Sequence, residues 1–131
     1  MNLTLQEIDQ AYSKLISKRL TVYQPSTGCK IYRFKNEYSN FECTVDDANG
    51  EKKKIKNIQA HRFALYARYR TSVMPVIDGQ KLQCSHLCHN EGCVNTEHVR
   101  AETSSMNNFR KTCKKNGYCT GHGGGHPDCI F

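Results

Sequence analysis

The densest group of chemically capable residues lies in the run CSHLCHNEGCVNTEHV, from Cys84 to Val99. Thiolates and imidazoles are preferred ligands of zinc, and a structural zinc ion takes four of them in a tetrahedron. The run offers six candidates: Cys84, His86, Cys88, His89, Cys93 and His98. Because one ion cannot use all six, the run predicts a metal site and leaves side chains over for other chemistry.

The spacing of Cys88, Cys93 and His98, with four residues between neighbours, places three ligands on one compact loop. A closed tetrahedral site needs a fourth ligand from elsewhere in the chain. Cys29 and Cys43 are both available. We favour Cys29, which follows a turn, over Cys43, which lies within a predicted strand and is expected to pack as a small apolar side chain.

The C-terminal sequence CKKNGYCTGHGGGHPDCIF contains a second set of ligands among glycines, and could hardly hold a shape without metal. It offers five candidates for four positions: Cys113, Cys119, His122, His126 and Cys129. We take Cys113, Cys119, His126 and Cys129 as the predicted set, with His122 as the alternative to His126. Two structural zinc sites are therefore expected, and zinc rather than another metal follows from the ligand types.

The composition suits a domain stabilised by metal. The chain has 131 residues, 37% of them hydrophobic, and no tryptophan, which predicts one small domain with a limited core. The N-terminus lacks the pattern of a signal peptide, so the cysteines are expected to be metal ligands rather than disulfides. We expect an intracellular protein, in the nucleus, or in the cytoplasm if the chain is prokaryotic or viral. No segment is long and apolar enough to cross a membrane.

The formal net charge is +7, and two sites of three thiolates and one neutral histidine around Zn²⁺ would leave about +5. Aromatic residues are interspersed with lysines and arginines, which suits a polyanion such as nucleic acid. The charge alone fits a merely soluble basic surface equally well.

The surrounding segments predict an α+β domain with an antiparallel β-sheet. Thr4, with Glu7 three residues later, is expected to cap a helix over residues 4–18. The other expected elements are strands over 29–34, 40–47 and 51–59, a turn at 47–50, a helix over 60–70, extended segments over 81–87 and 97–101, and a helix over 103–112. His86 would point to the same face of its strand as Cys84, a predicted buried residue, and Cys88.

The run SHLCHN, followed by Cys93, His98, Asn107 and Cys113, resembles the His-Cys box of the intron-encoded homing endonucleases, which belong to the ββα-metal (His-Me finger) nucleases. The resemblance covers residues 84–113 without a gap. It implies that residues 1–131 form a single His-Cys box nuclease domain. The implied parts are an N-terminal helix at 1–20, a DNA-contacting β-sheet at 28–58, a ββα-metal motif at 82–112 and a second zinc loop at 113–131.

The resemblance also implies roles for the ligands and for two further residues. The first structural zinc would be bound by Cys29, Cys88, Cys93 and His98, and the second by Cys113, Cys119, Cys129 and one of His122 or His126. His86 would be the general base that activates water, and Asn107, nine residues after His98, would be the one protein ligand of a catalytic Mg²⁺.

The implied activity is that of a site-specific DNA endonuclease that hydrolyses phosphodiester bonds of double-stranded DNA. A nonspecific nuclease and a non-catalytic zinc-dependent DNA-binding module are the alternatives. The residues expected to contact DNA are Lys30, Arg33, Lys52, Lys54, Lys56 and Arg62. Alternation along a strand would put Lys52, Lys54 and Lys56 on one face.

Two features depart from the resemblance. The arginine that contacts the scissile phosphate in the best-known members aligns with Ala60, so that Arg62 or Gln59 could serve only after a shift of register. Those members dimerise through an extension beyond the second zinc cluster, whereas this chain ends at Phe131. A homodimer and a monomer both remain open.

Overall fold

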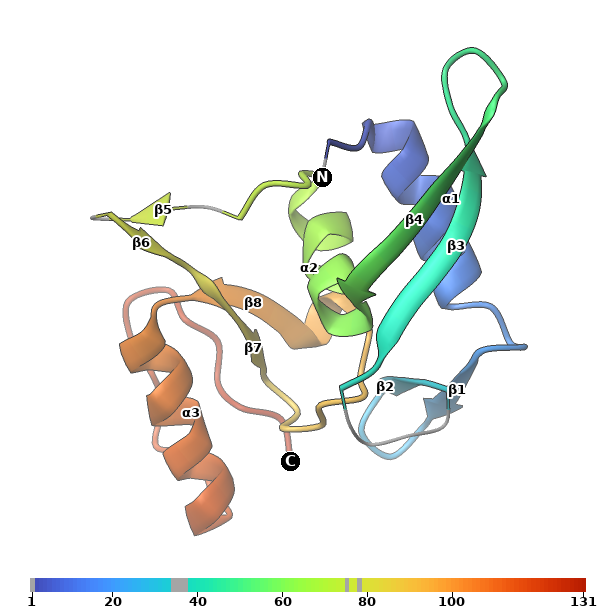
Figure 1. Ribbon diagram of the computed structural model, residues 1–131. Coiled ribbons are helices and arrows are strands. Elements are labelled where there is room, and N and C mark those ends of the chain that lie inside the picture. Colours follow the sequence, from blue (N-terminus) through green and yellow to red (C-terminus); the bar gives the residue numbers. More distant parts are fainter. Residues whose placement is uncertain (1, 34–37, 75, 78) are drawn as a thin grey trace.

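Figure 1 shows a computed structural model, which describes residues 2–33, 38–74, 76–77 and 79–131. Its elements, in chain order, are α1 (Leu5–Leu15), β1 (Thr21–Gln24), β2 (Cys29–Tyr32), β3 (Asn40–Asp46), β4 (Lys52–Gln59), α2 (Ala60–Tyr69), β5 (Val76–Ile77), β6 (Gln80–Lys81), β7 (Gln83–His86), the short 3₁₀ helix η1 (Thr96–His98), β8 (Val99–Glu102) and α3 (Ser104–Asn116). Each of the four sheets is an antiparallel pair of strands. The predicted α+β class is confirmed.

The helix α1 begins with the predicted capping box. The Thr4 hydroxyl accepts from the backbone N–H of Glu7 at 3.2 Å, and the Glu7 carboxylate accepts from the backbone N–H of Thr4 at 3.1 Å. The helix ends at Leu15 rather than residue 18, where the Thr21 hydroxyl donates to the Leu15 carbonyl. Ile8, Ala11 and Leu15 are fully buried. This face packs mainly against β3 and α2, so burial rather than helix propensity stabilises α1.

The hairpin β3–β4 closes through the predicted DANG turn, in which the Asp47 carboxylate accepts from the backbone N–H groups of Asn49 and Glu51. The outer face of β4 carries Lys52, Lys54 and Lys56, whereas Ile55 is buried, as alternation predicts. The register of the hairpin shifts between Phe41 and Cys43 of β3. On β4 the shift falls at Asn57, which has a φ of 60°. This irregularity moves the next buried position to Ile58.

The region expected to form one sheet over residues 28–58 consists of two separate hairpins. The strand β2 pairs with β1, for which no strand was predicted, and within the described residues β3 pairs with β4 alone. Phe34, at the end of the predicted strand 29–34, lies outside the described residues. The strand β2 also forms an isolated bridge between Ile31 and Cys93. The β1–β2 hairpin therefore contacts the loop over residues 88–98, called the ligand loop below, rather than a larger sheet.

The strands β7 and β8 and the helix α3 follow one another as a ββα unit. In Figure 1, α3 lies beside β7 at the edge of the molecule, and α2 lies between the β7–β8 pair and the β3–β4 hairpin. Thr103 caps the start of α3, and Gly117, with a φ of 81°, ends it. The helix therefore ends four residues later than expected and includes Cys113.

One cluster of buried side chains joins the elements before residue 70 to the β7–β8 region. Phe41 and Phe63 lie edge to face at its centre, with ring centroids 5.6 Å apart, and Val94 and Val99 extend it under the ligand loop. Among the residues that the structure describes, no helix has the length and apolar character needed to cross a membrane.

Candidate functional site

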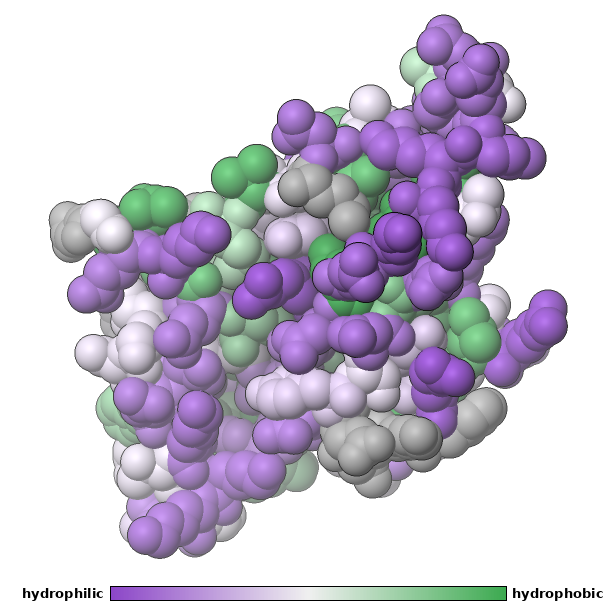
Figure 2. Space-filling model, in the orientation of Figure 1, coloured by the Kyte–Doolittle hydropathy of each residue, from purple (hydrophilic) through white to green (hydrophobic). Residues whose placement is uncertain are grey.

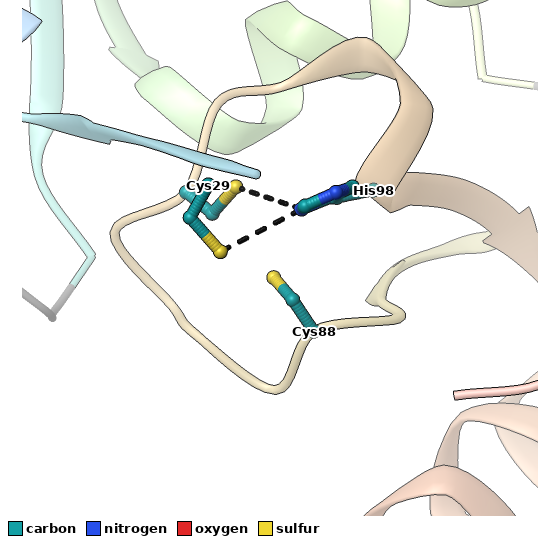
Figure 3. Close-up of side chains that lie close together, drawn as sticks. Cys29, Cys88 and His98 are labelled. Atoms are coloured by element: carbon teal, nitrogen blue, oxygen red, sulfur yellow. Dashed lines mark hydrogen bonds between the residues drawn. The ribbon is translucent and has the colours of Figure 1, made fainter. Parts of the chain in front are cut away.

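The four residues predicted for the first zinc site come together. The ligand atoms of Cys29, Cys88, Cys93 and His98 all lie within 4.8 Å of one another. Figure 3 shows Cys29, Cys88 and His98 converging on one point. Nδ1 of His98 lies 3.6 Å from Sγ of Cys29 and 3.5 Å from Sγ of Cys93. Zinc–ligand bonds of about 2.0–2.3 Å in a tetrahedron place nitrogen and sulfur ligands roughly 3.5 Å apart, so the cluster fits zinc.

Backbone contacts hold Cys29 against the loop although it is distant in sequence. The backbone N–H of Val94 donates to the Lys30 carbonyl at 2.8 Å, and that of Tyr32 donates to the Gly92 carbonyl at 3.0 Å. The Asn95 amide donates to the Gly28 carbonyl at 2.7 Å. These bonds explain why Cys29, at the start of β2, joins the first cluster, whereas Cys43 on β3 packs against the core as expected.

The thiols of the first cluster are already biased towards metal binding. A hydrogen bond from the Cys88 thiol lowers the pKa of Cys93, and backbone N–H groups around the loop lower it further. The same thiol–thiol bond raises the pKa of Cys88. One thiolate is thus stabilised by the fold itself, and a divalent cation would deprotonate the others.

The second cluster consists of Cys113, Cys119, His122 and Cys129, whose ligand atoms also lie within 4.8 Å of one another. Nε2 of His122 is 3.3 Å from Sγ of both Cys119 and Cys129, and 3.7 Å from Sγ of Cys113. Backbone N–H groups of Gly121 and Cys129 donate to Cys119 at 3.4 Å and lower its pKa. The cluster therefore fits a second structural zinc.

The preference for His126 as the fourth ligand of this cluster is corrected in favour of the alternative, His122. Nδ1 of His126 instead lies 3.1 Å from a carboxylate oxygen of Glu102 on β8. The two histidines are four residues apart in a glycine-rich loop, so spacing could not separate them. The buried carboxylate attracts His126 away from the sulfurs.

A buried ion pair beside the second cluster was missed by the sequence analysis. Arg110 on α3 donates to both carboxylate oxygens of Glu102, at 2.5 and 2.7 Å, and both side chains are about 1% exposed. The third nitrogen of Arg110 lies 3.5 Å from Sγ of Cys129. The pair locks α3 against β8 and connects both to the second cluster. No motif predicts it, because eight residues across a strand–helix junction have no characteristic spacing.

His86 is buried at the end of β7, and its Nε2 lies 3.1 Å from the Cys93 carbonyl. A carbonyl oxygen only accepts, so Nε2 carries the proton and Nδ1 has the free lone pair. Burial lowers the pKa of His86 below its ordinary value, which keeps the ring neutral at pH 7. The fold therefore holds the His86 ring neutral, in one tautomer whose Nδ1 is unprotonated, next to the first cluster.

His86 and Asn107 line the same small cavity, of about 60 Å³, between β7 and α3. Its other lining residues are Tyr38, Cys84, His89, Glu91, Arg110, Lys111 and Lys114. The Asn107 oxygen accepts from the Ser85 hydroxyl at 3.0 Å, and its amide nitrogen donates to Gln83 at 2.9 Å. An imidazole base and an amide oxygen thus meet at a cavity whose helical wall carries two exposed lysines.

His61, at the first turn of α2, is a further residue that the sequence analysis did not single out. Its ring centroid lies 5.3 Å from that of His86 and 4.4 Å from that of Tyr38. Burial, then the nearby His86 and Arg62, lower the pKa of His61 to about 3. Nδ1 of His61 is buried without a hydrogen-bond partner among the described residues. Its helical position with apolar neighbours gave no sign of this contact.

The basic residues expected to contact DNA fall in three places. Lys52, Lys54 and Lys56 lie on the outer face of the β3–β4 hairpin, where Lys52 pairs with Asp46 and Lys54 with Glu42. Figure 2 shows this hairpin, at the upper right, as largely hydrophilic. The other three residues are separate: Lys30 lies on β2, Arg33 follows β2, and Arg62 lies on α2 beside His61 and Gln83 at a second, larger hollow.

The ββα unit and the two clusters define a small α+β domain stapled by two Cys₃His sites that fit structural zinc. The family model described as the zinc-binding loop region of homing endonuclease matches residues 16–130. The chain therefore belongs to this family, which confirms the resemblance to a His-Cys box homing-endonuclease domain and points to a nuclease-related, DNA-binding function. Neither the curated proteins nor the solved structures contain a significant match to the chain.

Proposed function

We propose that this protein is a Mg²⁺-dependent DNA endonuclease that hydrolyses phosphodiester bonds at specific sites. His86 is the proposed general base and Asn107 the proposed protein ligand of the metal. The observation that carries the proposal is the shared cavity, in which the Cys93 carbonyl leaves Nδ1 of His86 unprotonated within reach of the same space that Asn107 lines. Membership of the family supports the same function.

Asn107 suits Mg²⁺ because this cation prefers oxygen ligands and retains several waters, so a protein often supplies few groups and the substrate phosphate supplies others. The amide oxygen has two lone pairs, and the Ser85 hydroxyl uses one of them. The second lone pair is enough for one metal bond. When bound, Mg²⁺ would neutralise charge on the phosphate and on the leaving 3′ oxygen.

The chain's own residues would then orient and activate the attacking water. Nδ1 of His86 accepts a proton from the water, whose oxygen attacks phosphorus, and Nε2 remains hydrogen-bonded to the Cys93 carbonyl. Burial holds the ring still and favours its neutral form. Lys111 and Lys114, on the α3 wall of the cavity, attract the phosphates on either side of the reacting one.

The remaining contacts to double-stranded DNA are assigned to the outer face of the β3–β4 hairpin. A two-stranded ribbon fits the major groove, and Lys52, Lys54 and Lys56 project from one face of it. Arg62, which lines one hollow with His61, would contact the DNA backbone there. Lys30 and Arg33, on or next to the separate β1–β2 hairpin, would contact a different stretch of the duplex.

Nicking of supercoiled and long linear DNA by the zinc-loaded protein with Mg²⁺ tests the proposal. We expect cleavage by the wild type, and loss of about 10²–10⁴-fold in rate for His86→Ala, which is typical of a removed general base. Zinc content is measured in both proteins, so that loss of the fold is distinguished from loss of the base. Discrete fragments support site specificity, and a smear indicates a nonspecific nuclease.

The pH dependence provides a second test. The pKa of His86 is lowered, so the rise of the rate with pH should level off below the ordinary histidine value of about 6.5, if the chemical step is measured. Tight binding of DNA with two bound zinc ions but no cleavage of any DNA would overturn the proposal. The domain would then be a non-catalytic DNA-binding module.

A further inference from the structure

The Asn107 side chain is held at both ends by one strand. Its oxygen accepts from the Ser85 hydroxyl at 3.0 Å, and its nitrogen donates to the Gln83 side-chain oxygen at 2.9 Å. Gln83 and Ser85 are two residues apart on β7, so both side chains point to the face that α3 covers. Two bonds of opposite polarity fix the plane of the amide and which end is oxygen.

Ser85 is fully buried and has a single hydroxyl proton, but it has two acceptors. One is the Asn107 oxygen, and the other is the carboxylate of Glu102 on β8. In the β7–β8 register, Gln83 lies opposite Glu102, which puts Ser85 diagonal to the carboxylate on the same face.

Glu102 is well suited to remain an acceptor. Burial alone would raise the pKa of its carboxyl group, but the hydrogen bond and charge of Arg110, with the hydrogen bond to His126, help to hold the pKa below its ordinary value. The bidentate bond from Arg110 fixes the carboxylate in place. A proton from Ser85 would therefore find a charged, stationary acceptor on either side of neutral pH.

We propose that Ser85 is a positioning residue for the metal ligand: its hydroxyl orients the Asn107 amide and can turn its proton to Glu102 when a divalent cation binds the Asn107 oxygen. The cation then gains access to the oxygen without leaving a buried hydroxyl proton unpaired, which would be unfavourable. This inference rests on the proposed function, because it assigns a second role to the same centre. It also makes the Arg110–Cys129 contact a link between the second zinc cluster and metal binding.

A binding experiment tests the proposal independently of catalysis. All variants are made in a His86→Ala background, so that a short DNA duplex stays intact, and Mn²⁺ is titrated into the zinc-loaded complex. Broadening of the Asn107 side-chain NH₂ signals in NMR spectra reports a paramagnetic ion at its oxygen. We expect Ser85→Ala to raise the Mn²⁺ concentration for half-maximal broadening by about tenfold or more, as is usual for groups that support a metal ligand.

Gln83→Ala is the second test, because Gln83 is exposed and its loss should not disturb folding. It should raise the same concentration by a smaller factor, and Ser85→Thr, which keeps a hydroxyl, should restore binding. Thr112→Ala is the matched control, since that hydroxyl lies on α3 and, among the described residues, hydrogen-bonds to the Asn108 carbonyl alone. In proteins with an intact His86, Ser85→Ala should raise the Mg²⁺ concentration needed for half-maximal nicking more than it lowers the rate at saturating Mg²⁺.

The outcomes separate this inference from the proposed function. Equal Mn²⁺ broadening in wild type, Ser85→Ala and Gln83→Ala overturns the positioning role, whatever the nuclease activity. No broadening of Asn107 in any of them overturns both the role and the metal assignment. A third outcome is that broadening depends on Ser85 but the protein with intact His86 cuts no DNA. This outcome supports the positioning role and overturns only the catalytic proposal.

Discussion

The two Cys₃His clusters have the same ligand types but different places in the architecture. The first joins Cys29 to ligands about 60 to 70 residues later, and Cys29, Cys93 and His98 are buried against the core. The second lies between Cys113 and Cys129, and three of its four ligands are half-buried. The first cluster is therefore part of the fold's interior, whereas the second fastens the C-terminal segment to the end of α3.

The largest effect should come from comparing a ligand lost from each cluster. Cys93→Ser should abolish the cooperative unfolding transition, because the ligand loop after β7 and the strand β2 would lose the metal that connects them. Cys119→Ser should lose one zinc ion but retain a cooperative transition. Thermal unfolding and zinc content, measured on both variants, check this. Equal loss of the transition in both would show that the clusters are equivalent.

The buried ion pair between Arg110 and Glu102 provides the next test, because it connects α3 and the second cluster to β8. Glu102→Gln leaves Arg110 charged and without its carboxylate, so stability should fall by about 3–5 kcal/mol. Urea denaturation measures this change. Lys54→Gln, which breaks an exposed pair with Glu42, is the control and should change stability by less than about 1 kcal/mol. Similar losses of stability in the two variants would mean that the ion pair does not hold α3 against β8.

Two glycines with positive φ offer a finer comparison of the regions. Gly28 has a φ of 76° beside the His98 ring, and Gly125 has a φ of 81° in the second loop with open space around its Cβ position. Alanine at Gly28 should cost about 1–2 kcal/mol of global stability from backbone strain. The same strain at Gly125 should leave the global transition nearly unchanged and increase hydrogen exchange only near the C-terminus. A drop in global stability for Gly125→Ala would mean that the second loop unfolds with the core.

The smallest effect concerns pH. His61 has a pKa of about 3 in the folded protein against 6.5 in its ordinary range, so the unfolded chain takes up a proton first as the pH falls. Stability from this group is complete above about pH 7 and is lost between pH 6.5 and 3. From pH 7 to 6 the expected loss is about 0.7 kcal/mol. Denaturation of wild type and His61→Phe at both pH values checks it, and equal slopes would contradict the assignment.

Much of the fold follows from local chemistry that the sequence displays. The capping box at Thr4 and Glu7, the DANG turn and the alternation along β4 are each confirmed, because each depends on residues only a few positions apart. The pairing of β2 was not predictable in the same way. It depends on the bridge from Ile31 to Cys93, and no local pattern reveals which distant segment a short strand will contact.

The candidate site shows the same division. Grouping of Cys88, Cys93 and His98 was predictable because tetrahedral coordination limits the ligand number, and Cys29, chosen from its place beside a turn, lies with them in the first cluster. The choice of His126 was wrong, because the carboxylate that attracts it is twenty-four residues away. The roles of His86 and Asn107 remain predictions.

The first cluster also has a consequence for how the chain folds. Cys29 and Cys88 are 59 positions apart, and closing a loop of that length costs about 3–4 kcal/mol of chain entropy. This loop includes β3, β4 and α2, which share one buried cluster with α1 and contain none of the candidate metal ligands. During synthesis these elements leave the ribosome before Cys88 does, so they can collapse first and shorten the effective distance. We infer that zinc is captured late, by a chain in which the elements between Cys29 and Cys88 have already packed together.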